Sequence, residues 1–291
     1  MRILAKIDVP YFVFPHGMLD PWFKESSRLK HFKKSIYWKF VESKVLERAN
    51  GVVFTCVEER DLAASTFQPY RCSPLVAPLG IHATDGASSS KIETFYQSFP
   101  AIRDKPYLLY LGRVHPKKGL NLLLESFLEM KQSIPDLVIA GPIDDKPFEM
   151  RMMELINKIH VDHPGWKCLW AGMLEGGKKW GALHAASAFV LPSHQENFGI
   201  AVVEALSVGT PVLITEKVNI YREIVEAKAG LACEDTVEGV KVMISRWMAM
   251  NGLERETLAA NATKCFLSNY EISRAAAHLI NVLQEAIGSR Q

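Results

Sequence analysis

From residue 105 to residue 235, the chain alternates short apolar runs with segments of helical period. The runs are apolar at successive positions, as expected for parallel strands buried on both faces. We predict strands at Pro106–Val114, Asp136–Ile143, Trp166–Leu174, Ala188–Ser193, Pro211–Thr215 and Gly230–Glu234. We predict helices at Gly119–Gln132, Phe148–His160, Gly177–Ala186, Gly199–Ser207 and Ile220–Ala227. This α/β order predicts a doubly wound Rossmann-like domain that binds its ligand at the carboxyl ends of the strands.

The front of the chain carries fewer such signals. PYFVFPHG (Pro10–Gly17) and GVVFTC (Gly51–Cys56) read as two buried strands, with a helix near Ser35–Arg48 between them. A doubly wound domain usually has four or more strands, so we expect a partial Rossmann-like domain that lacks its first part. The chain is therefore expected to be a fragment, a truncated product, or half of an enzyme completed by another chain.

Domain boundaries follow from the polar, small-residue-rich stretch His82–Asp104, which is typical of a linker. We place the partial first domain at 1–90, the linker at 91–104 and the complete second domain at 105–268. The remaining segment, 269–291, is predicted to be a helix that packs back toward the first domain.

Composition narrows the class of protein without naming a partner. The 291 residues are 48% hydrophobic and 23% charged with a net charge of +2, which is typical of a globular protein and not of a nucleic-acid binder. The five cysteines form no CxxC pair, so we expect reduced thiols. No signal peptide or membrane-spanning run is recognisable, and we expect a cytoplasmic location.

Two carboxylates flank the start of a predicted helix in PSHQENFGIAVVEALSVGTP (Pro192–Pro211). Glu196 lies in the loop and Glu204 inside the helix, up to about 12 Å apart at about 1.5 Å per residue. That separation is too large for an acid/base pair acting on one bond. It suits a nucleotide-sugar, because each acid can accept hydrogen bonds from sugar hydroxyls while the N–H groups near Phe198–Ile200 face the diphosphate.

A pair of cations follows the first strand of the same domain. LGRVHPKKGL places Arg113 and Lys118 between a strand and a helix. Arg binds two phosphate oxygens at once and Lys acts as a compact charge, so both suit a diphosphate. Because the carboxyl ends of the first and fourth strands of a doubly wound sheet can converge on one crevice, we expect these cations to meet the acids there.

With these motifs in place, the chain resembles the retaining glycosyltransferases of family 4, the glycogen-synthase-like group with the two-domain GT-B fold. The resemblance rests on GRVHPKKGL, AGML, FVLPSHQENFGIAVVEALSVGTPVL, NIYREIV and PHGMLDPW. It spans nearly the whole chain, but the Gly-rich loop with which the family begins does not precede PHGMLDPW. The resemblance implies a glycosyltransferase that moves a sugar, with retained configuration, from a nucleotide-diphosphate sugar to a glycan or lipid-linked acceptor.

The resemblance also implies roles for individual residues. Glu196 would hold the transferred sugar and Glu204 the ribose, while Arg113 and Lys118 would bind the diphosphate. His16 would face the sugar from the first domain, so the expected catalytic residues are His16, Arg113, Lys118 and Glu196. The expected donor-binding residues are Gly112, Arg113, Lys118, Met173, Leu174, Glu196, Asn197, Phe198, Gly199, Ile200 and Glu204. Met173 and Leu174 would border the base, and neither a metal ion nor a cofactor is expected.

Each of these residues also has an ordinary structural interpretation. Glu196 could cap the helix, where a negative charge is favourable, and Glu204 could be a solvent-exposed acid. Arg113 and Lys118 could belong to a solvated loop, and His16 could be a turn residue. A catalytically inactive relative that binds a nucleotide-sugar or a partner, and a GT-B-fold epimerase, therefore stay open as alternatives.

The segment from Phe23 to Arg48 is rich in both basic and aromatic residues. Such a segment can dock on an anionic membrane, where each basic residue contributes about 1 kcal/mol. The competing interpretation is a solvated helix whose aromatic side chains belong to the core. We favour the core for Tyr37 and Trp38 and a membrane contact, at its inner face, for the lysine-rich part before them.

Overall fold

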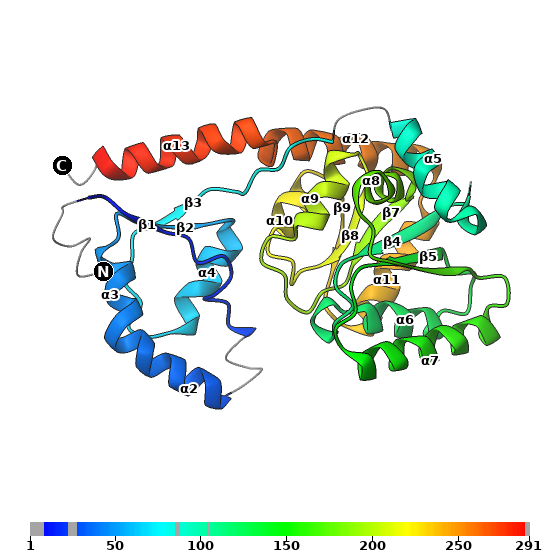
Figure 1. Ribbon diagram of the computed structural model, residues 1–291, viewed down its shortest axis with the longest axis horizontal. Coiled ribbons are helices and arrows are strands. Elements are labelled where there is room, and N and C mark those ends of the chain that lie inside the picture. The colour runs from blue at the N-terminus through cyan, green and yellow to red at the C-terminus, as the bar shows by residue number, and fades with distance from the viewer. Residues whose placement is uncertain (1–8, 23–27, 85–87, 104, 289–291) are drawn as a thin grey trace. The chain divides into compact units, whose positions relative to one another are not determined.

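The computed structural model describes residues 9–22, 28–84, 88–103 and 105–288, with the backbone alone at 28–31. Contacts within the chain divide it into two compact units. Unit 1 consists of Met1–Gly80 with Asn269–Gln291, and unit 2 of Ile81–Ser268. Figure 1 shows their elements.

In the described part of unit 2, six parallel strands form one sheet in the order β6-β5-β4-β7-β8-β9. The strands are β4 (Tyr107–Leu111), β5 (Asp136–Ala140), β6 (Cys168–Gly172), β7 (Ala188–Leu191), β8 (Val212–Thr215) and β9 (Gly230–Cys233). Each lies within a strand predicted from the sequence, but it is shorter, because the predicted ranges included residues of the loops. The chain order reverses between β4 and β7, and such a switch point is where doubly wound sheets bind ligands.

Helices cover both faces of this sheet, with α6 and α7 on one side and α8 and α9 on the other (Figure 1). The helices of the unit after β4 are α6 (Leu120–Glu129), α7 (Lys146–Asp162), α8 (Gly176–Ala185), α9 (Ile200–Ser207), α10 (Tyr221–Glu226), α11 (Val237–Ala249) and α12 (Gly252–Asn269). The four central strands β5, β4, β7 and β8 are almost completely buried, as the continuous apolar runs predicted, while the edge strands β6 and β9 are partly exposed.

The segment expected to be a linker is folded. Helix α5 (Ser88–Ser98) and the short 3-10 turn η3 (Pro100–Ile102) occupy most of 91–104 and belong to unit 2. α5 packs on α8, with Phe95 close to Gly181, and the side chains of Phe95 and Tyr96 are buried. The expectation of a linker at 91–104 is therefore wrong: the polar positions lie on the outer face of a helix whose two adjacent aromatic residues are in the core.

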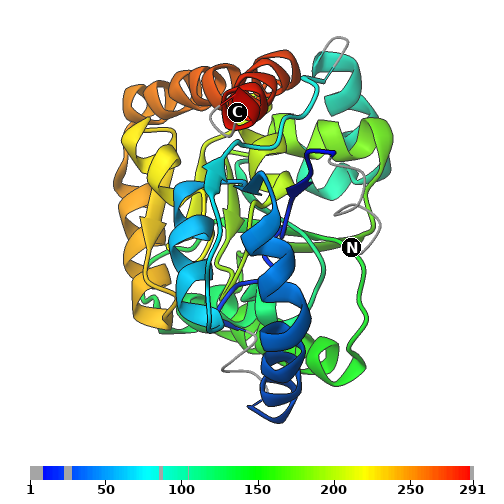
Figure 2. The same ribbon diagram turned by 90° about the vertical axis from the view of Figure 1, so that its left-hand side faces the viewer.

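Unit 1 contains a parallel sheet of three described strands in the order β1-β2-β3. The strands are β1 (Phe12–Val13), β2 (Gly51–Phe54) and β3 (Pro74–Val76), and β3 was not predicted. Between β1 and β2, the chain runs through α2 (Arg28–Tyr37), the π-helical turn η2 (Trp38–Glu42) and α3 (Ser43–Arg48) as one helical rod, seen in Figure 2. α4 (Val57–Thr66) follows β2.

The core of unit 1 forms around Trp38, which is 1% exposed and stacks on Phe67 with ring centroids 4.9 Å apart. The last helix of the chain, α13 (Ile272–Gly288), belongs to the same unit. A Cβ atom at Gly80 would lie 2.8 Å from Cβ of Ala275 on α13, so the strand exit and the helix are in close contact there.

Candidate functional site

The loop after β4 lies directly against the loop after β7. The first of these loops passes through the 3-10 turn η4 (Pro116–Lys118) and enters α6 at Gly119. Gly119 has a φ of 69°, and a Cβ atom there would lie 1.8 Å from the carbonyl oxygen of Pro192. Only glycine permits both this left-handed conformation and this approach of two backbones.

Backbone hydrogen bonds join the loops after β4, β7 and β8. The N–H of His194 donates to the carbonyl of Lys117 and the N–H of Glu196 to that of Lys217, both at 2.9 Å. The N–H of Asn219 returns a bond to the carbonyl of Glu196, also at 2.9 Å. The backbone that carries Glu196 is therefore fixed from two neighbouring strands, β4 and β8.

Lys118 and Glu196 form an ion pair at this place, with each side chain 18% exposed. Lys118 follows β4 and Glu196 follows β7, and these strands are neighbours on the two sides of the switch point. The structure thus brings together a cation and an acid that are 78 residues apart in the chain.

Arg113 comes from the same loop as Lys118 but is more exposed. Its side chain is 49% exposed, and its Nη1 lies 3.8 Å from the Oδ2 of Asp144, which follows β5. The hydroxyl of Tyr110 donates to the carbonyl of Arg113 at 3.1 Å. Burial raises the pKa of Tyr110, and the nearby charge of Glu196 raises it further, so this phenol stays a neutral donor.

The start of α9 adds backbone donors to the site. Gly199 has a φ of 73° and precedes the first helical residue, Ile200. The first N–H groups of a helix have no acceptor within it, and a Cβ atom at Gly199 would lie 3.2 Å from Cγ of Glu196, so the start of α9 is next to this acid. The Phe198 side chain is 4% exposed and belongs to the core, so its expected contribution to a donor site is limited to its backbone. The side-chain amide of Asn219 donates to Oδ1 of Asn197 at 3.3 Å. The N–H of Gly112, just after β4, donates to the carbonyl of Ala140 on β5.

Glu204 lies within α9 and is paired with a residue that the sequence did not single out. Nζ of Lys179 on α8 is 2.7 Å from Oε1 of Glu204, with side chains 24% and 16% exposed. α8 follows the loop of Met173 and Leu174, whose side chains differ: Met173 is 66% exposed and Leu174 is 5% exposed. Of these two residues, Met173 is the one whose side chain is accessible to a ligand.

His16 lies in unit 1, where it follows β1 with an exposed side chain. Its φ is 47°, which is uncommon for a residue other than glycine. The neighbouring N–H of Gly17 donates to the carboxylate of Glu59 at 2.6 Å, and the N–H and hydroxyl of Thr55 donate to its second oxygen. Glu59 is 4% exposed and was missed in the sequence, because it lies far along the chain from the turn that it holds.

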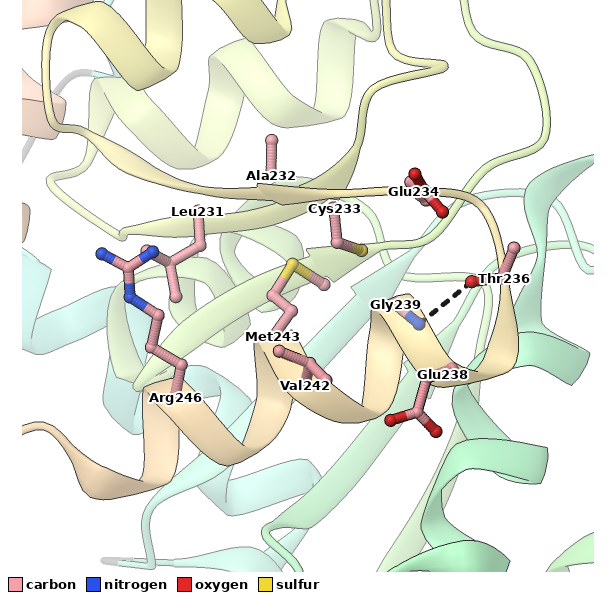
Figure 3. Close-up of a pocket in the computed structure, with 10 residues that line it drawn as sticks. All are labelled: Leu231, Ala232, Cys233, Glu234, Thr236, Glu238, Gly239, Val242, Met243 and Arg246. Carbon is pink, nitrogen blue, oxygen red and sulfur yellow. Dashed lines mark hydrogen bonds between the residues drawn. The ribbon is translucent and has the colours of Figure 1, made fainter.

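A cavity of about 290 Å³ lies between β9 and α11 (Figure 3). Its wall includes Cys233, Glu234, Met243 and Arg246, and none of the predicted site residues. Burial and nearby acids raise the pKa of Cys233 to about 12, so its thiol is protonated and a poor nucleophile. No two of the described residues that line this cavity form an ion pair of the kind that Lys118 and Glu196 form at the switch point.

The described residues show neither a metal site nor a membrane-spanning helix. Within the described ranges, no three His, Cys, Asp or Glu side chains come together as ligands of a metal ion. None of the described helices combines the length and the apolar character that crossing a bilayer requires.

Comparison with known proteins identifies the family. The model of the "Glycosyl transferases group 1" family matches residues 91–265, which is more than half of the chain. The chain belongs to the group 1 glycosyl transferases. The match covers most of unit 2, including all the predicted site residues except His16.

Two relatives of this family illustrate how distant the similarity is. The lipopolysaccharide 1,2-N-acetylglucosaminetransferase of Salmonella typhimurium is 24% identical over 183 residues, or 60% of this chain and 47% of the relative. The glycogen synthase of Mycobacterium tuberculosis is 27% identical over 135 residues, or 43% of this chain and 30% of the relative. The chain thus spans about half, or less, of the length of these curated relatives.

Solved structures confirm the fold. Anabaena Alr3699/HepE in complex with UDP has a TM-score of 0.78 at 14% identity, over 97% of this chain and 74% of that chain. The same protein with UDP-glucose has a TM-score of 0.75 at 15% identity, over 99% and 74%. The predicted α/β, GT-B-like fold with Rossmann-like parallel sheets is therefore correct.

Proposed function

We propose that this group 1 glycosyl transferase binds a nucleotide-diphosphate sugar in the crevice between the ends of β4 and β7 and transfers the sugar to an acceptor. The observation that carries the proposal is the contact of Lys118 with Glu196 at the switch point. A cation for phosphate and an acid for hydroxyls lie side by side there, as a phosphate-linked sugar requires.

The diphosphate is proposed to bind Arg113, Lys118 and the N–H groups at the start of α9. The exposure of Arg113 leaves its guanidinium able to move from Asp144 to a phosphate, because a surface ion pair at 3.8 Å is worth little. Lys118 is proposed to leave Glu196 and bind a nearby phosphate oxygen of the ligand. Gly199 and Gly112 allow the backbone to approach the ligand.

The two acids are proposed to bind the hydroxyls at the two ends of the donor. Glu196 accepts from the transferred sugar and Glu204 from the ribose, with Met173 and Leu174 beside the base. Asn197 shapes the loop that carries Glu196, and Ile200 lines the entrance with an exposed side chain. His16 is proposed to contact the transferred sugar from unit 1.

Transfer is proposed to follow the retaining course of family 4. Arg113, Lys118 and the α9 amides would stabilise the negative charge that develops on the leaving nucleoside diphosphate, and loss of one such donor typically costs about 100-fold to 1000-fold in rate. No carboxylate is proposed as a nucleophile, and the chemistry is expected to need no resident cofactor or metal. The partial character of the first domain stays a prediction from the sequence.

Uracil is the first base to test, because the structural relative from Anabaena was solved with UDP and with UDP-glucose. We expect the unaltered chain to bind UDP, GDP or their sugars, as measured by calorimetric titration. Arg113→Ala and Glu204→Ala should each weaken that binding at least about tenfold, or about 1.4 kcal/mol. Lys131→Ala on the exposed end of the α6 region serves as the matched control and should change nothing.

If Arg113→Ala and Glu204→Ala bind as tightly as the unaltered chain, the proposed site is wrong. Binding without release of nucleoside diphosphate in the presence of glycan or lipid acceptors would favour the inactive relative instead. Transfer would be scored by the release of nucleoside diphosphate and by the anomeric configuration of the product.

The acceptor is proposed to be a glycan or a lipid-linked saccharide at an anionic membrane surface. Residues 23–27 of the basic segment and the side chains of residues 28–31 lie outside the described part of the chain, but the side chains of the helical rod from residue 32 on support this idea. Phe32, Ile36 and Phe40, spaced by four residues, are 64%, 49% and 63% exposed, while Trp38 is buried. Tyr37 is 56% exposed, so its expected place in the core is wrong.

Vesicle sedimentation tests this membrane contact. More of the chain should sediment with vesicles of phosphatidylcholine and phosphatidylglycerol than with phosphatidylcholine alone, and added salt should reduce the difference, because lysines beside the aromatic stripe include Lys33 and Lys39. The double substitution Phe32→Ser with Phe40→Ser should abolish sedimentation. Equal sedimentation with both kinds of vesicle would exclude the contact.

A further inference from the structure

Lys179 forms a partly buried ion pair with Glu204, to which neither the sequence motifs nor the proposed roles assign it. Nζ of Lys179 lies 2.7 Å from Oε1 of Glu204, and the side chains are only 24% and 16% exposed. The ammonium also lies 4.7 Å from the centroid of the Trp180 ring. Because both side chains are mostly buried, salt screens this ion pair less than a pair on the surface, and the Trp180 ring adds a cation–π contact.

The helix that carries Lys179 is fixed on several sides. A Cβ atom at Gly181 would lie 2.0 Å from the carbonyl oxygen of Lys91 on α5, so the two helices touch through their backbones. The hydroxyl of Tyr107 donates to the carbonyl of Ala182 on α8, and the hydroxyl of Thr210 to the carbonyl of Leu183, both at 2.7 Å. The position of the Lys179 backbone is therefore set by the fold, and only its side chain is free to adjust.

The contact engages one oxygen of Glu204 and leaves the other for a ligand. Among the described residues, none donates a hydrogen bond to Oε2 of Glu204. An ionised carboxylate can accept several hydrogen bonds, so it can serve Lys179 and a hydroxyl at the same time. A glutamate loses up to about 2 kcal/mol of side-chain entropy when it is immobilised, and here the ion pair has already restricted it.

We propose that Lys179 is the positioning residue for Glu204: it holds the carboxylate in the orientation that accepts hydrogen bonds from the ribose hydroxyls of a nucleoside diphosphate. The proposal rests on the proposed function, which places the ribose at Glu204. It makes Lys179 responsible for the preference for ribose over sugars without these hydroxyls. Lys178, the next residue of α8, is exposed and has no such role.

Calorimetric titration of the full chain tests this. The ligands are whichever of UDP, GDP and ADP binds most tightly, and its 2′,3′-dideoxy counterpart, which lacks both hydroxyls. Lys179→Met should weaken binding of the ribose ligand by at least about fivefold and of the dideoxy ligand by less than about twofold. Lys179→Arg should retain most of the preference, and Lys178→Met should behave as the unaltered chain. Lys179→Gln gives a second variant, should Lys179→Met not fold.

A double-mutant cycle adds a readout that a purely structural role would not produce. If Lys179 acts through Glu204, Lys179→Met should cause no further loss of ribose preference in a Glu204→Gln background. The proposal is overturned if Lys179→Met weakens both ligands equally, or weakens neither. If the proposal is overturned but Arg113→Ala still weakens nucleotide binding, only the role of Lys179 is wrong. If Arg113→Ala does not weaken binding either, the proposed donor site itself is wrong.

Discussion

At the scale of single residues, Glu59 shows how one buried carboxylate fixes a turn. It accepts from the N–H of Gly17 at 2.6 Å and from both donors of Thr55. Each buried donor left without an acceptor costs about 1–3 kcal/mol, so Glu59→Ala should lower the free energy of unfolding by more than about 2 kcal/mol in urea titrations. Asp61→Asn, on the same helix but 59% exposed, is the control and should have little effect. A loss no larger than that of the control would mean that the turn around His16 does not depend on Glu59.

Residue-scale prediction from the sequence succeeded where a motif fixed the place of a side chain. Of the cations and acids expected to meet, Lys118 and Glu196 do, because each follows a strand end and the strand order determines which ends are neighbours. Arg113 instead lies beside Asp144, and Glu204 pairs with Lys179. Lys179 and Glu59 were missed, because Lys179 pairs with Glu204 and Glu59 holds Gly17, each far along the chain, although Glu59 also binds the nearby Thr55. Such pairs depend on how helices pack, which periodicity does not report.

At the scale of elements, the β4–α6 connection depends on Gly119. A Cβ atom at this residue would lie 1.8 Å from a backbone oxygen of the β7–α9 loop, and its φ of 69° disfavours any L-residue. Gly119→Ala should therefore lower the free energy of unfolding by more than about 1 kcal/mol and weaken nucleotide binding at the same time. Gly165→Ala is the matched control, because no atom lies within 4 Å of a Cβ atom there. Equal melting temperatures of the two variants would contradict this view of the connection.

Elements with a strong hydrophobic period were predictable, and short or polar ones were not. The six strands of unit 2 were found because a strand buried on both faces reads as a continuous apolar run. β3 (Pro74–Val76) was missed because three residues give too little pattern. α5 was taken for a linker because its first turn is SSSK, although the helix packs on α8 and buries Phe95 and Tyr96.

At the scale of the whole molecule, the predicted donor-binding residues lie in one unit. All of them fall between Gly112 and Glu204, inside the continuous stretch Ile81–Ser268. We expect residues 81–268, produced alone, to fold and to bind nucleoside diphosphates within about threefold of the full chain, while transfer is lost. Titration of both proteins with the same ligand measures this. A loss of more than about tenfold in the fragment would show that unit 1 takes part in nucleotide binding.

The bonds that join the three loops of the crevice run between main-chain atoms, from His194 to Lys117, from Glu196 to Lys217 and from Asn219 to Glu196. They do not depend on which side chains these residues carry. Engineers who wish to change the donor preference could therefore exchange exposed lining side chains, such as that of Met173, and leave the supporting scaffold intact. Glycines at the loop contacts are the exception, since there the main chain itself admits no substituent.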